Sequence, residues 1–239
     1  MKPRILILST ESFHHTYFIN NMLRKWEVVG VFYETDRVRF PFGTLSPFEQ
    51  EEARYEKENF FSQIDSEIPK SVPVFHVSSM NSPEAHALLA EQDYDLGFVF
   101  GCGRISGNTI ALFKSSFLNI HRGDSSRYRG LDSDLWAIYH DDFESIGATL
   151  HEVDARLDTG AVVKTGSIVL RPDLEIWQIR YETTLLATDQ ALKAAQARSE
   201  GHLKSSPQTK LGRYYSAMPT DLKAWCSARF KQRLNRRFV

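Results

Sequence analysis

The sequence predicts an α/β fold: a doubly wound, mostly parallel sheet with helices on both faces and a short helical C-terminal extension. Short apolar runs, rich in β-branched and aromatic residues, alternate with helix-like segments along most of the chain. This alternation is typical of parallel strands joined by crossover helices. Every apolar run is shorter than the roughly 18 residues of a membrane span, so buried strands account for these runs.

The expected strands are residues 5–8, 28–33, 72–77, 96–100, 117–120, 148–153 and 161–170, the last two as antiparallel additions. The expected helices are residues 13–25, 82–92, 131–140 and 173–198. Apolar residues recur at helical spacing from Phe13 to Met22. Ser82 is a typical N-cap before Pro83, and the last helix is rich in Leu, Ala, Gln and Lys. Residues 34–71 are the least regular, with a charged helix expected near residues 50–59. This segment either covers a site or, as we expect, lies on the surface without a role in a site.

The length and the charge of the chain limit the classes of protein to which it can belong. A chain of 239 residues suggests one substantial domain, here residues 1–170, followed by the extension at residues 171–239. Lys and Arg number 29 against 30 Asp and Glu, so the net charge of −1 creates no global attraction to nucleic acid or to an anionic membrane. Residues 223–239 carry six positive charges and no acid, which indicates a phosphate contact or, as we expect, a solvated helix end.

The two cysteines, Cys102 and Cys226, cannot form a disulfide framework or a zinc cluster, which fits a reducing compartment. The apolar stretch at residues 5–8 is too short for the core of a signal peptide. We therefore expect a cytoplasmic protein. The oligomeric state stays open, with a homodimer among the options.

The densest polar cluster, residues 119–130, follows the fifth expected strand. Ligands of open α/β sheets bind beyond the carboxyl ends of the strands, where this cluster should emerge. Asn119 and His121 are two residues apart and so share one face of the strand. An amide can donate to a developing oxyanion, and an imidazole can move protons. Asp158, in a later polar turn, could orient His121; the alternative is that these side chains only hydrogen-bond the fold.

Three other features suggest different chemistry. The glycines of residues 101–107 follow a strand, as in a dinucleotide loop, but that loop normally follows the first strand, so a nicotinamide enzyme is a minor alternative. His14 and His15, with His76 and His86, lack the spacing of a metal site and are expected at the surface or in packing. Cys102 is expected to be a small buried residue rather than a nucleophile.

Three blocks in register resemble the folate-dependent formyltransferase family, which includes methionyl-tRNA and sugar N-formyltransferases. The blocks are Gly103–Ile105, then Asn119–His121 with Arg127–Gly130, and then Gly147–Leu150 with Leu157–Gly160. Their order and separations also match, and the resemblance spans residues 5–170. It implies a Rossmann-like formyltransferase fold, a catalytic domain at 1–170 and transfer of a formyl group from N10-formyltetrahydrofolate to an amine. No metal is required.

The resemblance also implies the residues of the site. Asn119, His121 and Asp158 would be catalytic. The main chain of two segments would hold the pterin of the folate: Phe100, Gly101, Cys102, Gly103, Arg104 and Ile105 from one, and Val153, Asp154 and Leu157 from the other. Asn119 and protonated His121 would then stabilise the oxyanion of the tetrahedral intermediate, and Asp158 would stabilise the imidazolium.

The loop at residues 122–126 departs from the family, which commonly has Pro-Ser-Leu-Leu-Pro there. The polar residues Arg122, Asp124, Arg127 and Arg129 are expected either to bind a polar acceptor or to form internal pairs. The region after residue 170 is shorter than the tRNA-binding β-barrel region of methionyl-tRNA formyltransferase, and residues 212–215 resemble a Gly-x-Tyr-Tyr segment of sugar formyltransferases. The resemblance therefore favours an amino sugar nucleotide destined for a surface polysaccharide. The alternatives are another amine (an amino acid or aminoacyl-tRNA), an NADP-dependent oxidoreductase, or a catalytically silent folate-binding protein.

Overall fold

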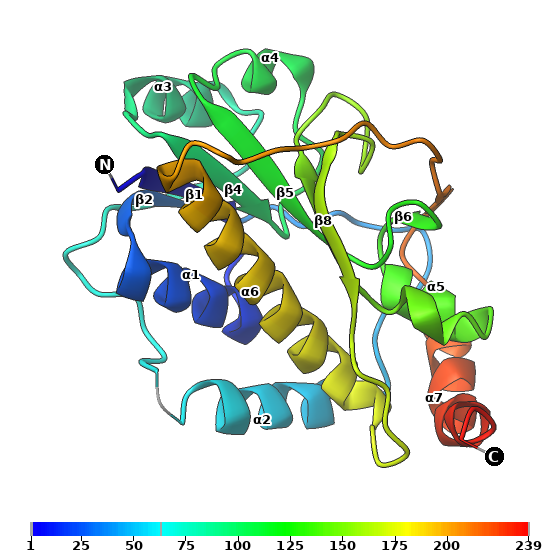
Figure 1. Cartoon of the computed structure of the whole chain (residues 1–239). Coiled ribbons are helices and arrows are strands. Elements are labelled where there is room, and N and C mark those ends of the chain that lie inside the picture. Colours follow the sequence, from blue (N-terminus) through cyan, green and yellow to red (C-terminus); the bar gives the residue numbers. More distant parts are fainter. Residues whose placement is uncertain (1, 63, 239) are drawn as a thin grey trace.

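The computed structural model describes residues 2–62 and 64–238. A single sheet runs through the molecule in the order β3-β2-β1-β4-β5-β7-β8 (Figure 1). Its strands are β1 (Arg4–Ser9), β2 (Glu27–Glu34), β3 (Val74–Val77), β4 (Leu96–Phe100), β5 (Ser116–Arg122), β7 (Gly147–Glu152) and β8 (Val162–Ser167). The first five strands are parallel, and β7 and β8 are antiparallel additions. The predicted doubly wound, mostly parallel α/β fold is confirmed.

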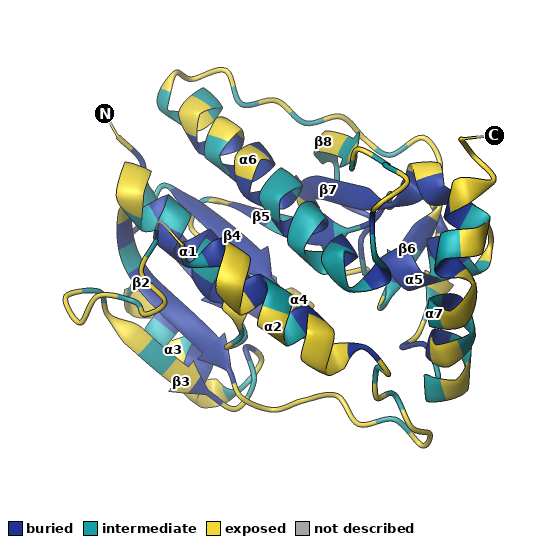
Figure 2. Ribbon diagram, turned by 90° about the horizontal axis from the view of Figure 1, so that it is seen from below, coloured by how far each residue is buried: buried dark blue, intermediate teal, exposed yellow. Residues whose placement is uncertain are grey.

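Helices cover both faces of this sheet (Figure 1). The helices of the described residues are α1 (Phe13–Lys25), α2 (Glu49–Phe60), α3 (Pro83–Glu91), α4 (Gly107–Ile110), α5 (Ser133–Tyr139), α6 (Ile179–Ser199) and α7 (Thr220–Asn235), with 3-10 turns at Phe143–Ser145 and Ile176–Gln178; α5 and α7 lie beside the sheet. Figure 2 shows α1, α2 and α6 in front of a sheet whose strands are mostly buried. α3 and α4 lie on the opposite face.

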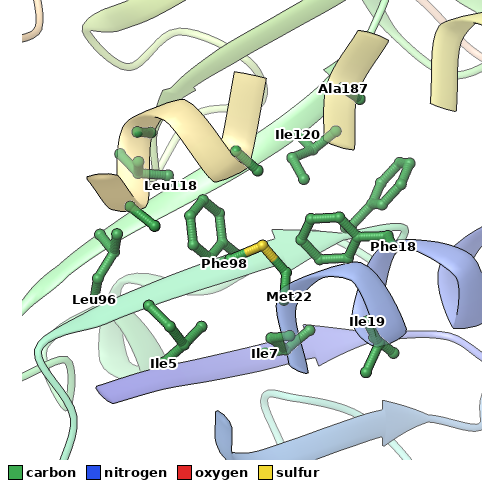
Figure 3. Packing of buried hydrophobic residues seen from close by; sticks show 14 of the residues in the cluster. Ile5, Ile7, Phe18, Ile19, Met22, Leu96, Phe98, Leu118, Ile120 and Ala187 are labelled. Carbon is green, nitrogen blue, oxygen red and sulfur yellow. The ribbon is translucent and has the colours of Figure 1, made fainter. Parts of the chain in front are cut away.

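Apolar burial against the sheet explains why the chain forms these layers. In Figure 3, Phe18 and Met22 of α1 pack onto Ile7 and Phe98 of the central strands, and Ala187 of α6 lies beside Ile120. These side chains are almost fully buried, and burying each large one contributes about 1.5–3 kcal/mol. Small residues of α6 let that helix lie close to the sheet. This packing joins the first part of the expected C-terminal extension to the sheet domain.

A second apolar cluster lies beside the sheet and holds the rest of the C-terminal region. Here α5 and α7 pack together, and a two-stranded sheet forms between β6 (Tyr128–Gly130) and β9 (Arg213–Tyr215). Most cations of the basic C-terminal segment are engaged within the fold. Lys223 pairs with Asp132 at 3.0 Å, and Arg233 pairs with Asp141 at 2.5 Å.

Several element ends differ from those predicted, each for a local reason. β3 begins at Val74, because Pro73 has no N–H for the ladder. α5 begins only after Asp132, whose φ of 50° lies in the left-handed region. The long helix starts at Ile179, after a 3-10 turn. Within the described residues, no helix combines the length and apolar character needed to span a membrane.

Candidate active site

A cavity of about 580 Å³ opens at the carboxyl ends of β1, β4 and β5. The strand order reverses between β1 and β4, which is where ligands bind in doubly wound sheets. The cavity volume lies within the range of ordinary small-molecule sites. Its wall comes from the residues that follow each of these strands and from two loops at residues 130–133 and 153–158.

Asn119 and His121 reach this cavity together, as their spacing on β5 predicts. Asp158 reaches it from the turn between β7 and β8. The amide Nδ2 of Asn119 donates to Asp158 Oδ1 at 3.3 Å, and His121 Nδ1 lies 3.5 Å from Asp158 Oδ2. The structure therefore brings the amide, the imidazole and the carboxylate into one cluster.

Asp158 is buried, and several groups hold its carboxylate in the ionised form. Burial alone raises the pKa of a carboxyl group, but the imidazoles of His121 and His151 and the N–H of Gly130 outweigh it. Together they hold the pKa of Asp158 below its usual range. The Gly130 N–H donates to Oδ2 at 2.8 Å. The site thus contains a permanently charged carboxylate beside two imidazoles at neutral pH.

The hydrogen bonds of His121 decide which nitrogen can exchange a proton. Its Nε2 lies 2.9 Å from the carbonyl oxygen of Tyr128. A carbonyl oxygen only accepts, so Nε2 carries the proton in the neutral ring. Nδ1, the ring nitrogen without a proton in that tautomer, faces Asp158.

His151 belongs to the same cluster and was missed by the sequence analysis. It lies on β7 directly opposite Asn119, and its Nε2 is 3.1 Å from Asn119 Nδ2 and 3.5 Å from Asp158 Oδ1. Its Nδ1 faces the Glu152 carbonyl oxygen at 2.8 Å, which leaves Nε2 as the acceptor. The signal in the sequence is the alternation in residues 147–152, which puts Thr149 and His151 on one face of an added strand.

His14 and His15 are buried and packed, one of the two placements expected for them, and they also line the cavity. Burial, with nearby positive groups, lowers the pKa of both rings well below the usual range. His15 Nδ1 lies 2.9 Å from Ser12 Oγ and packs its ring edge-on against Phe100. Because burial keeps these rings neutral, they form a polar, uncharged wall.

All nine residues predicted to hold the folate lie on the cavity wall: Phe100, Gly101, Cys102, Gly103, Arg104, Ile105, Val153, Asp154 and Leu157. At Gly101, φ is 87° and an added Cβ would approach the His15 ring to 2.4 Å, so this turn requires glycine. The Asp154 carboxylate accepts a hydrogen bond from Thr159 Oγ1 and so shapes its own turn. Burial raises the pKa of the Cys102 thiol, which keeps it protonated.

The four polar residues expected to meet an acceptor divide into two groups. Arg122 lines the cavity and lies 3.6 Å from Asp134. The others hold different parts of the chain. Arg127 pairs with Asp142 at 2.8 Å, the Asp124 carboxylate accepts from the N–H of residue 126, and Arg129 donates to the carbonyls of residues 157 and 212. Arg127 thus forms an internal Arg–Asp pair, whereas Asp124 and Arg129 bind main-chain groups.

The irregular segment at residues 34–48 contributes Val38 and Phe40 to the cavity wall. Leu131 and Tyr214 lie on the same wall from other loops. Val38, Leu131 and Tyr214 are among the exposed large hydrophobic side chains of the molecule. An added Cβ at Gly130 would approach the Tyr214 ring to 2.8 Å, so this ring lies directly beside the residue that binds Asp158. Exposed apolar groups around a polar site are typical of ligand-binding rims.

Comparison with known proteins supports the family implied by the sequence blocks. A curated relative, methionyl-tRNA formyltransferase of Roseiflexus castenholzii, is 26% identical over 187 residues, which cover 77% of this chain and 55% of the relative. The chain spans about half the length of the curated relatives that it matches first.

Solved structures show the same fold at low identity. A sugar N-formyltransferase from a Shewanella species matches with a TM-score of 0.62 and 13% identity, over 90% of this chain and 77% of the other. An N-formyltransferase from Helicobacter canadensis, in complex with folinic acid and dTDP-3-aminofucose, matches with a TM-score of 0.60 and 16% identity, over 89% of this chain and 70% of the other. The model of the formyl transferase family matches residues 6–188, most of the sheet and the first half of α6. The chain therefore belongs to the formyl transferase family.

Proposed function

We propose that this protein transfers a formyl group from N10-formyltetrahydrofolate to the amine of a nucleotide-linked amino sugar. The observation that carries the proposal is the convergence of Asn119, His121 and Asp158 on one cavity. Formyl transfer to an amine develops negative charge on the formyl oxygen and releases a proton from the attacking nitrogen. An amide donor, and an imidazole whose free ring nitrogen faces a carboxylate, suit those two needs.

The proposal gives each side chain a distinct task. Asn119 donates to the formyl oxygen by exchanging its long 3.3 Å bond to Asp158, while the shorter contact with His151 holds the amide in place. Nδ1 of His121 takes the proton from the attacking amine and returns it to N10 of the folate as the bond between the formyl carbon and N10 breaks, and the Asp158 carboxylate stabilises the imidazolium that forms in between. His151 orients the amide and is thus a positioning residue.

The donor would lie along residues 100–105 and 153–158. This wall places apolar Ile105, Val153 and Leu157 beside main-chain amide and carbonyl groups, which suits a flat heteroaromatic ring with polar edges. When bound, the donor supplies the activated formyl group. The chain's own contribution is to hold that group in front of Asn119 and His121 and to exclude water.

The acceptor class rests on the rim of the cavity and on the structural relatives. The exposed Tyr214 and Leu131 offer a flat apolar surface to a sugar or base, and Arg122 offers positive charge. The Helicobacter canadensis relative holds dTDP-3-aminofucose together with folinic acid. The curated methionyl-tRNA formyltransferases favour a second candidate acceptor, an aminoacyl-tRNA.

A mass-spectrometric assay separates these candidates. The protein is mixed with N10-formyltetrahydrofolate and a panel of nucleotide-linked amino sugars, amino acids and methionyl-tRNA, and each acceptor is examined for the added formyl group. We expect formylation of a nucleotide-linked amino sugar and its loss in H121A, with the fold retained. Formylation of methionyl-tRNA alone would overturn the acceptor proposal. Near wild-type turnover in H121A would overturn the role of His121.

A further inference from the structure

We infer that Gln208 is a positioning residue for the catalytic carboxylate, and this inference rests on the proposed function. Gln208 lies in the extended segment between α6 and β9, far from Asp158 in sequence. Its Nε2 donates to the main-chain carbonyl of Asp158 at 3.0 Å and to that of Gly160 at 2.9 Å. Its Oε1 accepts from Ser125 Oγ at 3.1 Å. One side-chain amide therefore ties the Asp158 turn to the loop that follows His121.

Asp158 needs such support because its backbone is in a strained conformation. Its φ is 54°, in the left-handed region that residues with a Cβ rarely occupy. Such conformations persist where the surroundings over-determine them, and they occur often at active sites. The two donations from Gln208 hold the carbonyls on and after this residue. Relaxation of φ would swing the carboxylate away from the His121 ring and from the Gly130 N–H that it binds.

The segment that carries Gln208 is itself anchored on both sides. Before it, Ser206 exchanges two main-chain hydrogen bonds of 2.8 Å with Val162 at the start of β8. After it, the Gly212 N–H donates to the Ser125 carbonyl at 3.1 Å, and β9 pairs with β6. An added Cβ at Gly212 would approach the main chain of Arg127 to 2.4 Å, so the two segments are in close contact. These contacts fix the position of Gln208, and its two hydrogen bonds in turn fix the position of the Asp158 turn.

Arg129, on β6, supports the same turn. Its Nη1 donates to the Leu157 carbonyl at 3.2 Å, and its Nε donates to the Gly212 carbonyl. The carbonyls of residues 157, 158 and 160 are therefore all bound by side chains from outside the turn. Gln208 differs from Arg129 in that it binds the carbonyl of the strained residue itself. This makes Gln208 the sharper site for a test.

Two variants and one control test the inference. Q208E keeps the size and the acceptor for Ser125 but replaces the donor of both hydrogen bonds, and Q208M removes all polar contacts. Q92E is the matched control, because Gln92 is also half-buried and its Nε2 donates to a main-chain carbonyl, that of Leu88, away from the cavity. A group displaced from its productive geometry loses about tenfold to a hundredfold in rate, so we expect kcat to fall by that factor in both Gln208 variants. In both Gln208 variants, the KM for the acceptor and the melting temperature should change no more than they do in Q92E.

The pH profile distinguishes positioning from a loss of packing. The carboxyl group introduced by Q208E regains one donor when it is protonated, so its deficit in kcat relative to the wild type should narrow as the pH falls from about 8 toward 5.5. The deficit of Q208M should stay constant over this range. Amide hydrogen exchange at Gly130, which donates to Asp158, should accelerate by about tenfold in Q208M and stay unchanged in Q92E.

The outcomes separate this inference from the proposed function. If the wild type transfers no formyl group to any acceptor, the proposed function fails, and hydrogen exchange at Gly130 still decides whether Gln208 holds the carboxylate. Wild-type kcat in Q208M, or unchanged exchange at Gly130, would overturn the inference. A fall in kcat that is fully explained by the fraction of unfolded protein would also overturn it. So would a kcat deficit of Q208E that stays the same at every pH.

Discussion

Replacing Asp158 with asparagine removes one charge from the centre of the site and keeps the size of the side chain. The carboxylate oxygen lies 3.5 Å from His121 Nδ1. At an effective dielectric constant of about 20, a unit charge pair at that distance interacts by about 5 kcal/mol. If the imidazolium forms only as the amine is deprotonated, that interaction stabilises the transition state selectively. We therefore expect D158N to lower kcat by about 10³-fold.

The assay is initial-rate formyl transfer, with a folding check by thermal melting. D142N is the control, because Asp142 also carries a lowered pKa and pairs with Arg127, but at a site outside the cavity. We expect D142N to retain its kcat within about threefold, because the asparagine oxygen can still accept from Tyr128 and Ser145, and an ion pair with the exposed Arg127 is weak. A folded D158N protein with kcat within tenfold of the wild type would refute the electrostatic reasoning.

Two further predictions concern packing and titration around the cavity. G101A should weaken folate binding by at least about tenfold, because a Cβ there is strained at φ 87° and meets the His15 ring, whereas G107A, with nothing within 4 Å of its Cβ, should bind normally. Isothermal titration with folinic acid checks this, and equal affinities would contradict it. Burial raises the pKa of Glu52 to about 7, and the positive charge of Arg180 counters it only in part. The folded protein therefore holds a proton on Glu52 that the unfolded chain releases above the usual pKa of a glutamate. The free energy of unfolding should fall as the pH rises from that usual pKa to about 7. In urea unfolding, the free energy of unfolding of the wild type should fall by about 1–3 kcal/mol over this pH range, and that of E52Q should not. The same pH dependence of the unfolding free energy in both proteins would refute this prediction.

Much of the sheet could be predicted because buried parallel strands leave a local signal. Residues 96–100 form an apolar run whose predicted bounds match β4. The shared face of Asn119 and His121 also follows from local alternation. These inferences need only neighbouring residues.

The rest of the site depends on pairings that local patterns do not contain. His151 joins Asn119 only through the antiparallel register of β5 and β7, which the sequence of either strand leaves undetermined. Gln208 has no periodic signal, because it acts from an extended segment through two main-chain carbonyls. The polar loop offered two arrangements of equal plausibility, and only the structure shows that Arg127 and Arg129 contact other parts of the chain.

The most direct test of the account is a crystal structure of the protein with a stable N10-formyl folate analogue. We expect the ring system along residues 100–105 and 153–158. We also expect the formyl oxygen within hydrogen-bond distance of Asn119 Nδ2, with the formyl carbon facing His121 and Asp158. An analogue bound in another cavity, or one whose formyl group points away from these three side chains, would contradict it.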